Sequence, residues 1–515
     1  MKKLFKGLSL FVILAILMGL GAPALAPAAP KEIHAHPMLV EMASQDPEYK
    51  VSVIVQKMLG SQDVEALVER LGGQVTQNLS IINAFAAEMT ASAAYELAAS
   101  PDVRWVSLDA PMEGAACVDC VSSAALVNNY VKTVRADKVW NLSTPLQGQG
   151  IGVAVLDSGV NYQTDLYTLM GRNRVVASVS TQLGYNQSTF DGYSHGSNVA
   201  GIVGGNGRTS NGKYIGIAPL VNIINVKVCD DLKYGECTTQ AVVNGLQWVL
   251  EHKNTYNIRV VNLSLNTSVP ESYHTSPIAG AIEVLWFNGI VVVVSAGNKG
   301  TAGLYAPAND PFAIVVGAVD DKNTLSIADD KVAGFSSFGT TVDGFSKPDI
   351  VAPGTNIVSL LGNMGMGLPA EHPKNIVDGS YFKMSGTSVA APIVSGAVAL
   401  LLQDEPNLTP DQVKYRLMAT ANKNWQGYSQ DKAGAGYLDI YAAIYGTTTQ
   451  SANTGTLPSQ LLTTGSEPIS WGSIGWNSIG WNSIGWNSIG WNSIGWNSIG
   501  WNSIGWNSDY WEDQQ

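Results

Sequence analysis

Clustered basic charge is what this sequence most clearly lacks. It holds 29 Lys and Arg against 41 Asp and Glu, a net charge of −12, and no long basic run beyond its first residues. Binding to phosphate backbones needs clustered Lys and Arg, so nucleic acid is excluded as an expected partner. The acidic balance is typical of a protein that is kept soluble by its charge.

Long apolar runs are also scarce, and the one clear case lies at the N-terminus. Three lysines precede an apolar stretch over residues 8–20, and the small-residue pattern Ala24-Leu25-Ala26 follows it. The stretch is short for a bilayer span, and Gly21 and Pro23 end it quickly, which disfavours the alternative of a membrane anchor. The pattern predicts a signal peptide over residues 1–26 and therefore a secreted protein, extracellular or at the cell surface.

Cysteine is rare as well, with four residues in 515. Cys229 and Cys237 flank a short polar loop and could close it as a disulfide, which suits an exported protein. Cys117 and Cys120 form a C-x-x-C that has no second pair and no nearby His, so it is weak evidence for a zinc or redox site. A local disulfide in an exposed linker is the alternative for this pair.

The length predicts two to four domains. Residues 50–109 have an order of their own, with strands expected at 50–56, 81–89 and 103–108 and helices at 61–71 and 90–99. This β-α-β-α-β order resembles that of small ferredoxin-like α+β domains. Residues 110–133 are small and polar and indicate a linker.

The largest unit is expected over residues 134–446, where strands and helices alternate. Continuous apolar runs, typical of strands buried on both faces, occur at 151–156, 221–228, 259–265, 290–295 and 313–319. Helical patterns lie between them, for example at 239–252 and 277–287. The sequence therefore predicts an α/β fold, with a parallel sheet flanked by helices on both faces.

The composition changes again after residue 446. Residues 447–470 are rich in Ser, Thr and Gly and indicate a flexible linker. A five-residue unit, Trp-Asn-Ser-Ile-Gly, then repeats over 471–508, and residues 509–515 are acidic and polar. The repeat indicates either a module that binds a surface or a polysaccharide, or a low-complexity disordered tail.

Three residues carry the chemical signal of the large unit. Asp157 directly follows an apolar strand, where open parallel sheets place reactive groups, although it could simply cap a turn. His195 lies in a Gly-rich turn before a run of small residues, and Ser388 precedes an apolar helix that it could also cap. Their order along the chain, Asp then His then Ser, differs from that of α/β-hydrolases and of chymotrypsin-like enzymes, and it matches the subtilisin arrangement.

Six blocks of the sequence resemble the subtilisin-like (subtilase) family. They are VAVLDSGV, HGSNVAG, VVNLSL, VVVVSAGN, KPDIVAPG and SGTSVAAP, and they are spread over nearly all of residues 134–446. Residues 50–109 are similar to the inhibitory propeptide of that family, notably in INAFAAEM and PDVRWVSLDA. The resemblance implies a secreted serine endopeptidase, made as an autoprocessed zymogen, that hydrolyses peptide bonds through an acyl-enzyme.

The same resemblance assigns roles to single residues. Ser388 is expected as the nucleophile, His195 as its general base, Asp157 as the group that orients the imidazole, and Asn298 as a side-chain donor of the oxyanion hole. The expected substrate-binding residues are Ser264, Leu265 and Asn266, which would pair with the substrate backbone, and Ala296 and Gly297, which would line the P1 pocket.

This chain departs from the family pattern at three places near the site. Asn198 stands where a His is usual, Val389 where many members have Met, and Asn266 where Gly is common, so the subsite beside Asn266 is expected to be narrower. No cofactor is required for the chemistry. Structural calcium cannot be assigned, because Asp165 lies near one potential ligand position but the loop at 204–216 does not reproduce the usual ligand pattern of the family.

The expected partners are protein or peptide substrates, with the chain's own propeptide as an intramolecular inhibitor. Two other functions remain open at this point. One is a catalytically weak pseudoprotease that binds peptides, against which the intact triad counts. The other is a surface-attachment protein that uses the Trp-rich tail.

Overall fold

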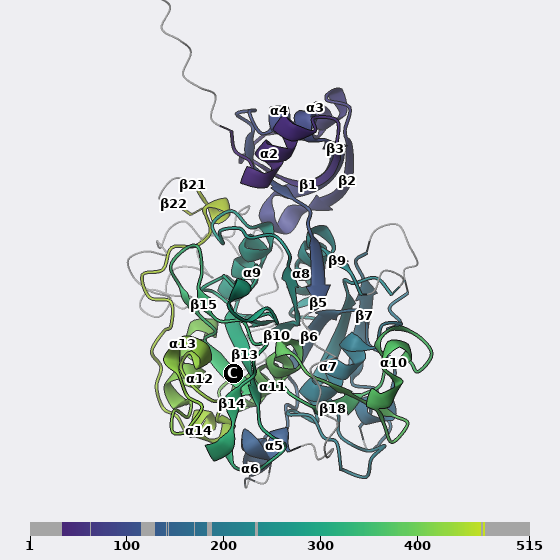
Figure 1. Cartoon of the computed structure of the whole chain (residues 1–515), viewed down its shortest axis with the longest axis vertical. Helices are drawn as coiled ribbons and strands as arrows, with labels where there is room; N and C mark the ends of the chain where they lie inside the picture. The colour runs from purple at the N-terminus through teal and green to yellow at the C-terminus, as the bar shows by residue number, and fades with distance from the viewer. Residues whose placement is uncertain are drawn as a thin grey trace, which may run out of the picture.

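The computed structural model describes residues 33–114 and 129–468, apart from gaps at 62, 141, 143, 169, 183–187, 232–234 and 465–466. A small N-terminal unit (residues 33–110) lies at the top of Figure 1, and a large unit (residues 129–446) lies below it. Several predictions from the sequence concern residues outside this range: the signal peptide at 1–26, the Cys117 and Cys120 pair, the repeats at 471–508 and the acidic end at 509–515.

The N-terminal unit is a four-stranded antiparallel sheet with the strand order β2-β3-β1-β4. Its elements are α2 (Pro37–Gln45), β1 (Lys50–Lys57), α3 (Val64–Arg70), β2 (Gln74–Leu79), the single turn η1 (Ser80–Ile82), β3 (Ala84–Thr90), α4 (Ala91–Leu97) and β4 (Val103–Leu108). The predicted β-α-β-α-β order was wrong in one respect, because it lacked β2. The sequence of β2, QVTQNL, is mostly polar, and pairing with β3 makes it a strand. The observed order, β-α-β-β-α-β, is that of ferredoxin-like domains.

Alternate residues of this small sheet serve two different cores. Val53 and Val55 of β1 pack with Phe85 of β3 under α3 and α4, inside the N-terminal unit. Ile54 and Ala86, one position along each strand, instead join the core of the large unit. Successive side chains of a strand point to opposite faces, so one face of the sheet closes its own unit and the other packs on the large unit.

The large unit is built on a sheet with the order β14-β13-β12-β10-β6-β8-β7, and β17 also pairs with β13. All of its neighbouring strands are parallel except β14. Five of the strands lie where continuous apolar runs predicted them: β6 (Gly152–Asp157), β8 (Asn222–Lys227), β10 (Ile258–Leu263), β12 (Val291–Ser295) and β13 (Ile314–Asp320). The remaining strands of the sheet are β7 (Val175–Ser180), β14 (Lys331–Val332) and β17 (Ile350–Pro353).

Helices cover both faces of this sheet, as predicted. α7 (His195–Gly204) packs against α11 (Thr387–Asp404), and α8 (Thr239–His252) packs against α9 (Pro277–Phe287). The N-terminal unit sits on α8 and α9 through η1 and β2. Smaller elements complete the unit: α5 (Tyr130–Thr133), α6 (Ala136–Trp140), η3 (Thr164–Leu166), η4 (Gly300–Ala302), η5 (Ile327–Asp329), β15 (Gly339–Thr340), β16 (Ser346–Lys347), β18 (Ile357–Leu360), α10 (Gly367–Glu371), η6 (Pro373–Asn375), β19 (Ile376–Val377), β20 (Tyr381–Met384), α12 (Pro410–Thr420), α13 (Gln430–Ala433) and α14 (Ile440–Ile444).

One described helix, α11, is long and apolar enough to cross a membrane by length and composition alone, which corrects the expectation that the one long apolar run lies at the N-terminus. Its apolar window is 89% buried inside the protein, where it contacts β10, β12, β13 and α7. The apolar composition of α11 is therefore explained by its place in the core, between the central strands and α7.

The linkers predicted around the large unit have more structure than expected. The expected linker at 110–133 includes a strand, β5 (Pro111–Gly114), at its start and α5 at its end. Within 447–470, where a flexible linker was expected, residues 447–462 lie against the large unit, and Ser459, Leu461 and Leu462 are buried. Ser, Thr and Gly in this stretch form local turns and backbone hydrogen bonds, which composition alone does not distinguish from a solvated chain.

Candidate active site

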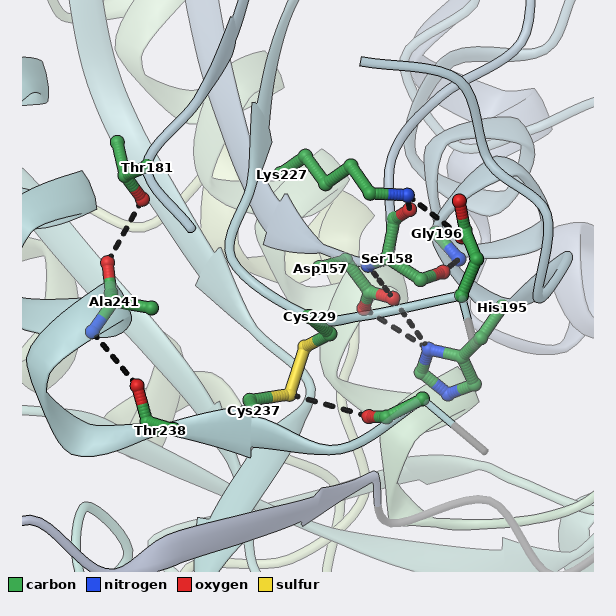
Figure 2. Close-up of a disulfide and its surroundings, with 12 residues drawn as sticks. Asp157, Ser158, Thr181, His195, Gly196, Lys227, Cys229, Cys237, Thr238 and Ala241 are labelled. Carbon is green, nitrogen blue, oxygen red and sulfur yellow. Dashed lines mark hydrogen bonds and ion pairs between the residues drawn. A yellow bond between two sulfur atoms is a disulfide. The ribbon is translucent and has the colours of Figure 1, made fainter. Parts of the chain in front are cut away.

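Two of the predicted residues, Asp157 and His195, meet at the carboxyl end of the central strand. Asp157 ends β6, and His195 begins α7. Figure 2 shows the imidazole facing the carboxylate, with Nδ1 at 2.8 Å from Oδ1 and 3.0 Å from Oδ2 of Asp157. The backbone N–H of Ser158 donates a further bond to Oδ1 of Asp157 (2.7 Å). With Nδ1 as the donor to Asp157, Nε2 is the nitrogen that can accept a proton.

α7 approaches this strand end closely because a glycine follows the histidine. A Cβ added at Gly196 would lie only 2.2 Å from the carbonyl oxygen of Gly159. The N–H of Gly196 also donates to Oγ of Ser158 (2.9 Å). The Gly after His195 is therefore a packing requirement that sets the distance between the histidine and Asp157.

A second carboxylate, Asp191, lies fully buried behind this pair. Its Oδ1 accepts hydrogen bonds from Oγ of Ser158 (2.8 Å) and from the N–H of Ser194 (2.7 Å), and its Oδ2 accepts one from the N–H of Ser197 (2.8 Å). Ser194 has a left-handed backbone (φ 75°) directly before α7. Asp191 thus holds the first turn of the helix that carries His195, and through Ser158 it also contacts the segment after Asp157.

These charges control the protonation of His195. Burial by itself would lower the pKa of the imidazole, but the charge and hydrogen bond of Asp157 and the charge of Asp191 outweigh it and raise the pKa of His195 above its usual value. Burial also raises the pKa of Asp191, and the nearby charge of Asp157 adds to that shift.

Ser388 is the second residue of α11, so it lies where the helix dipole favours negative charge. Its Oγ is buried and has no hydrogen-bond partner among the described residues, and the same is true of Nε2 of His195. The carbonyl of Ser388 accepts a bond from Oγ of Ser264 (2.7 Å), which in turn accepts one from the amide of Asn262 (2.9 Å). The first turn of α11 is therefore fixed to the end of β10 while the serine hydroxyl stays uncommitted.

Asn298 has one half of its amide anchored and the other half unused. Its Oδ1 accepts bonds from the N–H (2.9 Å) and Oγ1 (3.1 Å) of Thr387, the residue before Ser388. Its Nδ2 is buried and has no partner among the described residues. A buried donor without a partner is costly in a folded protein, so a group held next to Ser388 in this way is suited to a negative charge that forms during a reaction.

The predicted substrate-binding residues belong to two chain segments that lie side by side. Leu265 and Asn266 lie in β11 (Leu265–Thr267), and Ala296 and Gly297 follow the end of β12. The side-chain amide of Asn266 bridges them, since its Nδ2 donates to the carbonyl of Ser295 (2.9 Å). Ser264 bonds to the carbonyl of Ser388, and the N–H of Gly297 donates to Oγ1 of Thr387 (3.0 Å), so both backbone segments are connected to the start of α11.

A strand from the chain itself lies along β11. β5, which follows the N-terminal unit, pairs antiparallel with β11, with Gly114 opposite Leu265 and Glu113 opposite Asn266. On its other edge β5 pairs antiparallel with β9 (Cys237–Thr238), with Met112 opposite Cys237. An extended segment between two edge strands is the arrangement by which peptides bind through β-augmentation.

The predicted disulfide between Cys229 and Cys237 is formed, and both residues are buried. Cys237 belongs to β9, while Cys229 follows β8 and its N–H lies 3.3 Å from the carbonyl oxygen of Asp157. Figure 2 shows the bond beside Asp157 and His195. The disulfide therefore ties the outer strand of the peptide-binding sheet to the backbone next to Asp157.

The sequence did not predict three residues that hold the site in place: Asp191, Ser158 and Thr387. All three lie within the quoted blocks or a few residues before them, but their types are common in turns, and only the fold shows which atoms they contact. Asp165, the residue considered for calcium, uses Oδ1 for the N–H of Thr209 (2.6 Å) and Oδ2 for the hydroxyl of Tyr381 (2.7 Å). In the part of the chain that the structure describes, no group of three or more His, Cys, Asp or Glu is placed to hold a metal ion.

The chain is also similar to known proteins. The family model described as the subtilase family matches residues 148–437. Serine protease AprX of Bacillus subtilis (strain 168) is 33% identical over 413 residues, which cover 77% of this chain and 88% of that protein. Subtilisin NAT of Bacillus subtilis subsp. natto is 28% identical over 389 residues, covering 75% of this chain and 87% of that protein.

A solved structure is also similar. It is the crystal structure of fervidolysin from Fervidobacterium pennivorans, described as a keratinolytic enzyme related to subtilisin. It matches with a TM-score of 0.61 and 26% sequence identity, covering 78% of this chain and 62% of the fervidolysin chain, which is less than two thirds of that protein.

Proposed function

Because the chain belongs to the subtilase family and is a subtilisin-like serine peptidase, we propose that it is a secreted endopeptidase, made as a precursor that processes itself, with Ser388 as its nucleophile. One observation supports the assignment of residues above all others. Oγ of Ser388, Nε2 of His195 and Nδ2 of Asn298 are all buried without a partner among the described residues, although their neighbouring atoms are firmly bonded. The site thus keeps free the three atoms that acyl transfer uses.

The chemistry follows from these three atoms. Nε2 of His195 takes the proton from Oγ of Ser388 as that oxygen attacks the carbonyl carbon of the scissile bond, and Asp157 stabilises the imidazolium that forms. Nδ2 of Asn298 and the N–H of Ser388 stabilise the oxyanion. His195 then gives its proton to the leaving amine, which departs as the acyl-enzyme forms. Water, deprotonated by His195, hydrolyses that ester and restores the hydroxyl of Ser388.

The position of β5 supports the precursor part of the proposal. The N-terminal unit covers α8 and α9, and the strand that follows it occupies the place of a peptide between β11 and β9. The chain direction of β5 leads from β9 toward Leu265 and the residues beside Ser388. In this proposal the N-terminal unit is an inhibitor, β5 is its product-like end, and the bond cut in maturation lies beyond Gly114, within the predicted 110–133 region.

The export part of the proposal rests on two observations. Residues 1–26 have the pattern of a signal peptide, and the chain carries a disulfide, which is typical of proteins outside the cytoplasm. Protein and peptide substrates are expected because the family hydrolyses peptide bonds.

The test is maturation of the full chain. The purified Ser388→Ala protein should remain uncut, whereas the wild type should lose its N-terminal unit, with a new N-terminus that lies beyond Gly114 and within the predicted 110–133 region by sequencing. Ser326→Ala is the control, because Ser326 is an exposed serine of the large unit whose Oγ accepts the N–H of Ala328 (3.2 Å) at the start of η5, outside the bonds that hold Ser388. Normal maturation of pure Ser388→Ala protein would show that self-processing, and the role of Ser388 in it, are wrong.

A further inference from the structure

The segment that follows the large unit runs along its surface toward the N-terminal unit. Beyond α14, Nε of Arg416 donates to the carbonyl of Thr448 (2.8 Å), and the amide of Asn453 donates to the carboxylate of Asp411 (2.8 Å). In Figure 1 this segment continues up the left side of the molecule to β21 (Thr463–Thr464) and β22 (Glu467–Pro468), next to the N-terminal unit. Its path therefore connects two parts that are far apart in the sequence.

Residues 457–462, called the clasp below, are anchored on α9 and on the loop before it. The N–H of Ser459 donates to Oε2 of Glu283 in α9 (2.7 Å), and Oγ of Ser459 donates to the carbonyl of His274 (2.8 Å). The hydroxyl of Tyr273 donates to the carbonyl of Leu457 (2.8 Å). Glu283, Ser459 and Leu461 are buried, so this part of the clasp is packed against the large unit and is not a loose segment on its surface.

The other side of the clasp contacts the N-terminal unit. The side-chain amide of Gln56 in β1 is buried and uses both of its protons, one on the carbonyl of Leu461 (2.8 Å) and one on the carbonyl of Ile82 (2.9 Å). The guanidinium of Arg104 in β4 donates to the carbonyl of Gln460. The buried amide of Gln56 loses one of its partners outright if the clasp is absent.

A single position on α9 shows how the three parts meet. Gly280 has Ile82 of the N-terminal unit and Leu461 of the clasp on the same side, each 3.6 Å from the place where its Cβ would be. The helix surface there carries no side chain, and the two apolar residues from opposite ends of the chain cover it together. The surface that receives the N-terminal unit is therefore made of α8, α9 and the clasp.

We propose that the clasp is a docking surface for the N-terminal unit, so that the C-terminal segment of the mature enzyme sets how tightly its own inhibitor is held. The proposal rests on the proposed function, in which the N-terminal unit inhibits after it has been cut free. Loss of the contacts at Gln56 and Leu461 would then weaken the inhibitory complex without touching the reacting groups, since none of these residues lies near Ser388 or His195.

The experiment uses the full chain, which is allowed to process, and measures how peptidase activity appears as the cleaved complex is diluted. The dilution curve gives the dissociation constant of the N-terminal unit. Two variants on opposite sides of the contact are compared with wild type: Gln56→Leu, which removes the donors at similar volume, and Leu461→Ala, which removes the buried side chain. Asn453→Ala is the matched control, because Asn453 lies in the same segment but bonds to Asp411 of the large unit.

We expect Gln56→Leu and Leu461→Ala each to raise the dissociation constant by about tenfold or more. Asn453→Ala should leave it unchanged, and all variants should have the same kcat once the N-terminal unit has been fully digested. Equal dissociation constants in wild type and in both variants would overturn the role of the clasp. A wild-type complex that is fully active before dilution would instead overturn the inhibitory function itself, so the two failures can be told apart.

Discussion

The hydroxyl of Ser158 donates a hydrogen bond to the buried carboxylate of Asp191 at 2.8 Å, and it connects the segment after Asp157 to the helix that carries His195. Ser158 accepts the N–H of Gly196 through the same oxygen. The relative position of Asp157 and His195 therefore depends on a residue that is not one of the three proposed catalytic residues.

Removing the charge of Asp191 should shift the pH dependence of the enzyme. His195 must be neutral to accept a proton, so kcat/KM falls as pH drops through the pKa of the free imidazole, which lies above its usual value here. Asp191→Asn removes one of the charges that raise the pKa of His195. The acidic limb of the kcat/KM profile, where activity falls as His195 gains a proton, should therefore move to lower pH. The plateau of kcat/KM should also fall by about tenfold to a hundredfold, because bonds to a charged group are lost.

Ser158→Ala separates charge from geometry in this experiment. It removes the connecting hydroxyl and keeps the carboxylate, so the plateau of kcat/KM should fall while the pH at which kcat/KM declines on the acidic side stays near its wild-type value. Measurement of kcat/KM between pH 5 and pH 9 on one peptide checks both variants. An unshifted limb in Asp191→Asn would show that its charge does not act on His195.

Removing the free donor of Asn298 should slow the chemical step. Asn298→Ala is expected to lower kcat by about 10²–10³-fold with little change in KM, the range found when a single oxyanion-hole donor is lost. Asn298→Asp is the informative companion, because it keeps an acceptor for Thr387 but has no N–H. If the aspartate variant retained wild-type kcat, the residue would serve only to hold Thr387.

Much of this site could be predicted from the sequence, because each reactive residue lies in a short motif that also determines its own strand or helix. The strand before Asp157 is continuously apolar, and the helix after Ser388 is apolar on every face, so strand, helix and the ends that carry the reactive groups were all predictable. The order of the three residues along a parallel sheet then limits the arrangement to one family.

Contacts between distant segments could not be predicted in the same way. β2 is polar and becomes a strand through β3, and residues 457–462 become part of an interface through Glu283 and Gln56, which lie 176 and 405 residues away from their partners in the clasp. Asp191 is an ordinary turn residue until the fold buries it. Composition reports local preference, whereas these roles arise from pairing and burial across the chain.

Asn266 should restrict the size of the P1 residue. Its amide spans from β11 to the carbonyl of Ser295, next to Ala296 and Gly297, which are expected to line the P1 pocket. Asn266→Gly should raise the ratio of kcat/KM for a substrate with an aromatic P1 residue to kcat/KM for the same substrate with alanine at P1 by about tenfold. Room for one more methylene in a pocket typically changes discrimination by about this much. The ratio of the two kcat/KM values is the measurement, and Thr267→Ser, one position along the same strand, is the control. A ratio that does not change would place the amide outside the pocket.

The disulfide should matter for long substrates and not for short ones. Cys237 lies in β9, whose backbone pairs with the distal end of β5, while Cys229 is held beside Asp157. A substrate that extends several residues before the scissile bond would pair with β9 in the same way, so it needs that strand fixed in place. The Cys229→Ser, Cys237→Ser double variant should therefore show a KM for such peptides raised by about tenfold, which is a typical cost of ordering a loose segment on binding.

A short ester with one residue before the bond is the control, because it does not reach β9. Its kcat and KM should stay at the wild-type values, which would also show that the reacting groups are intact. Wild-type enzyme treated with a reductant should behave like the double variant. An equal loss on long and short substrates would mean that the bond supports the whole fold, and no loss on either would mean that β9 holds its place without it.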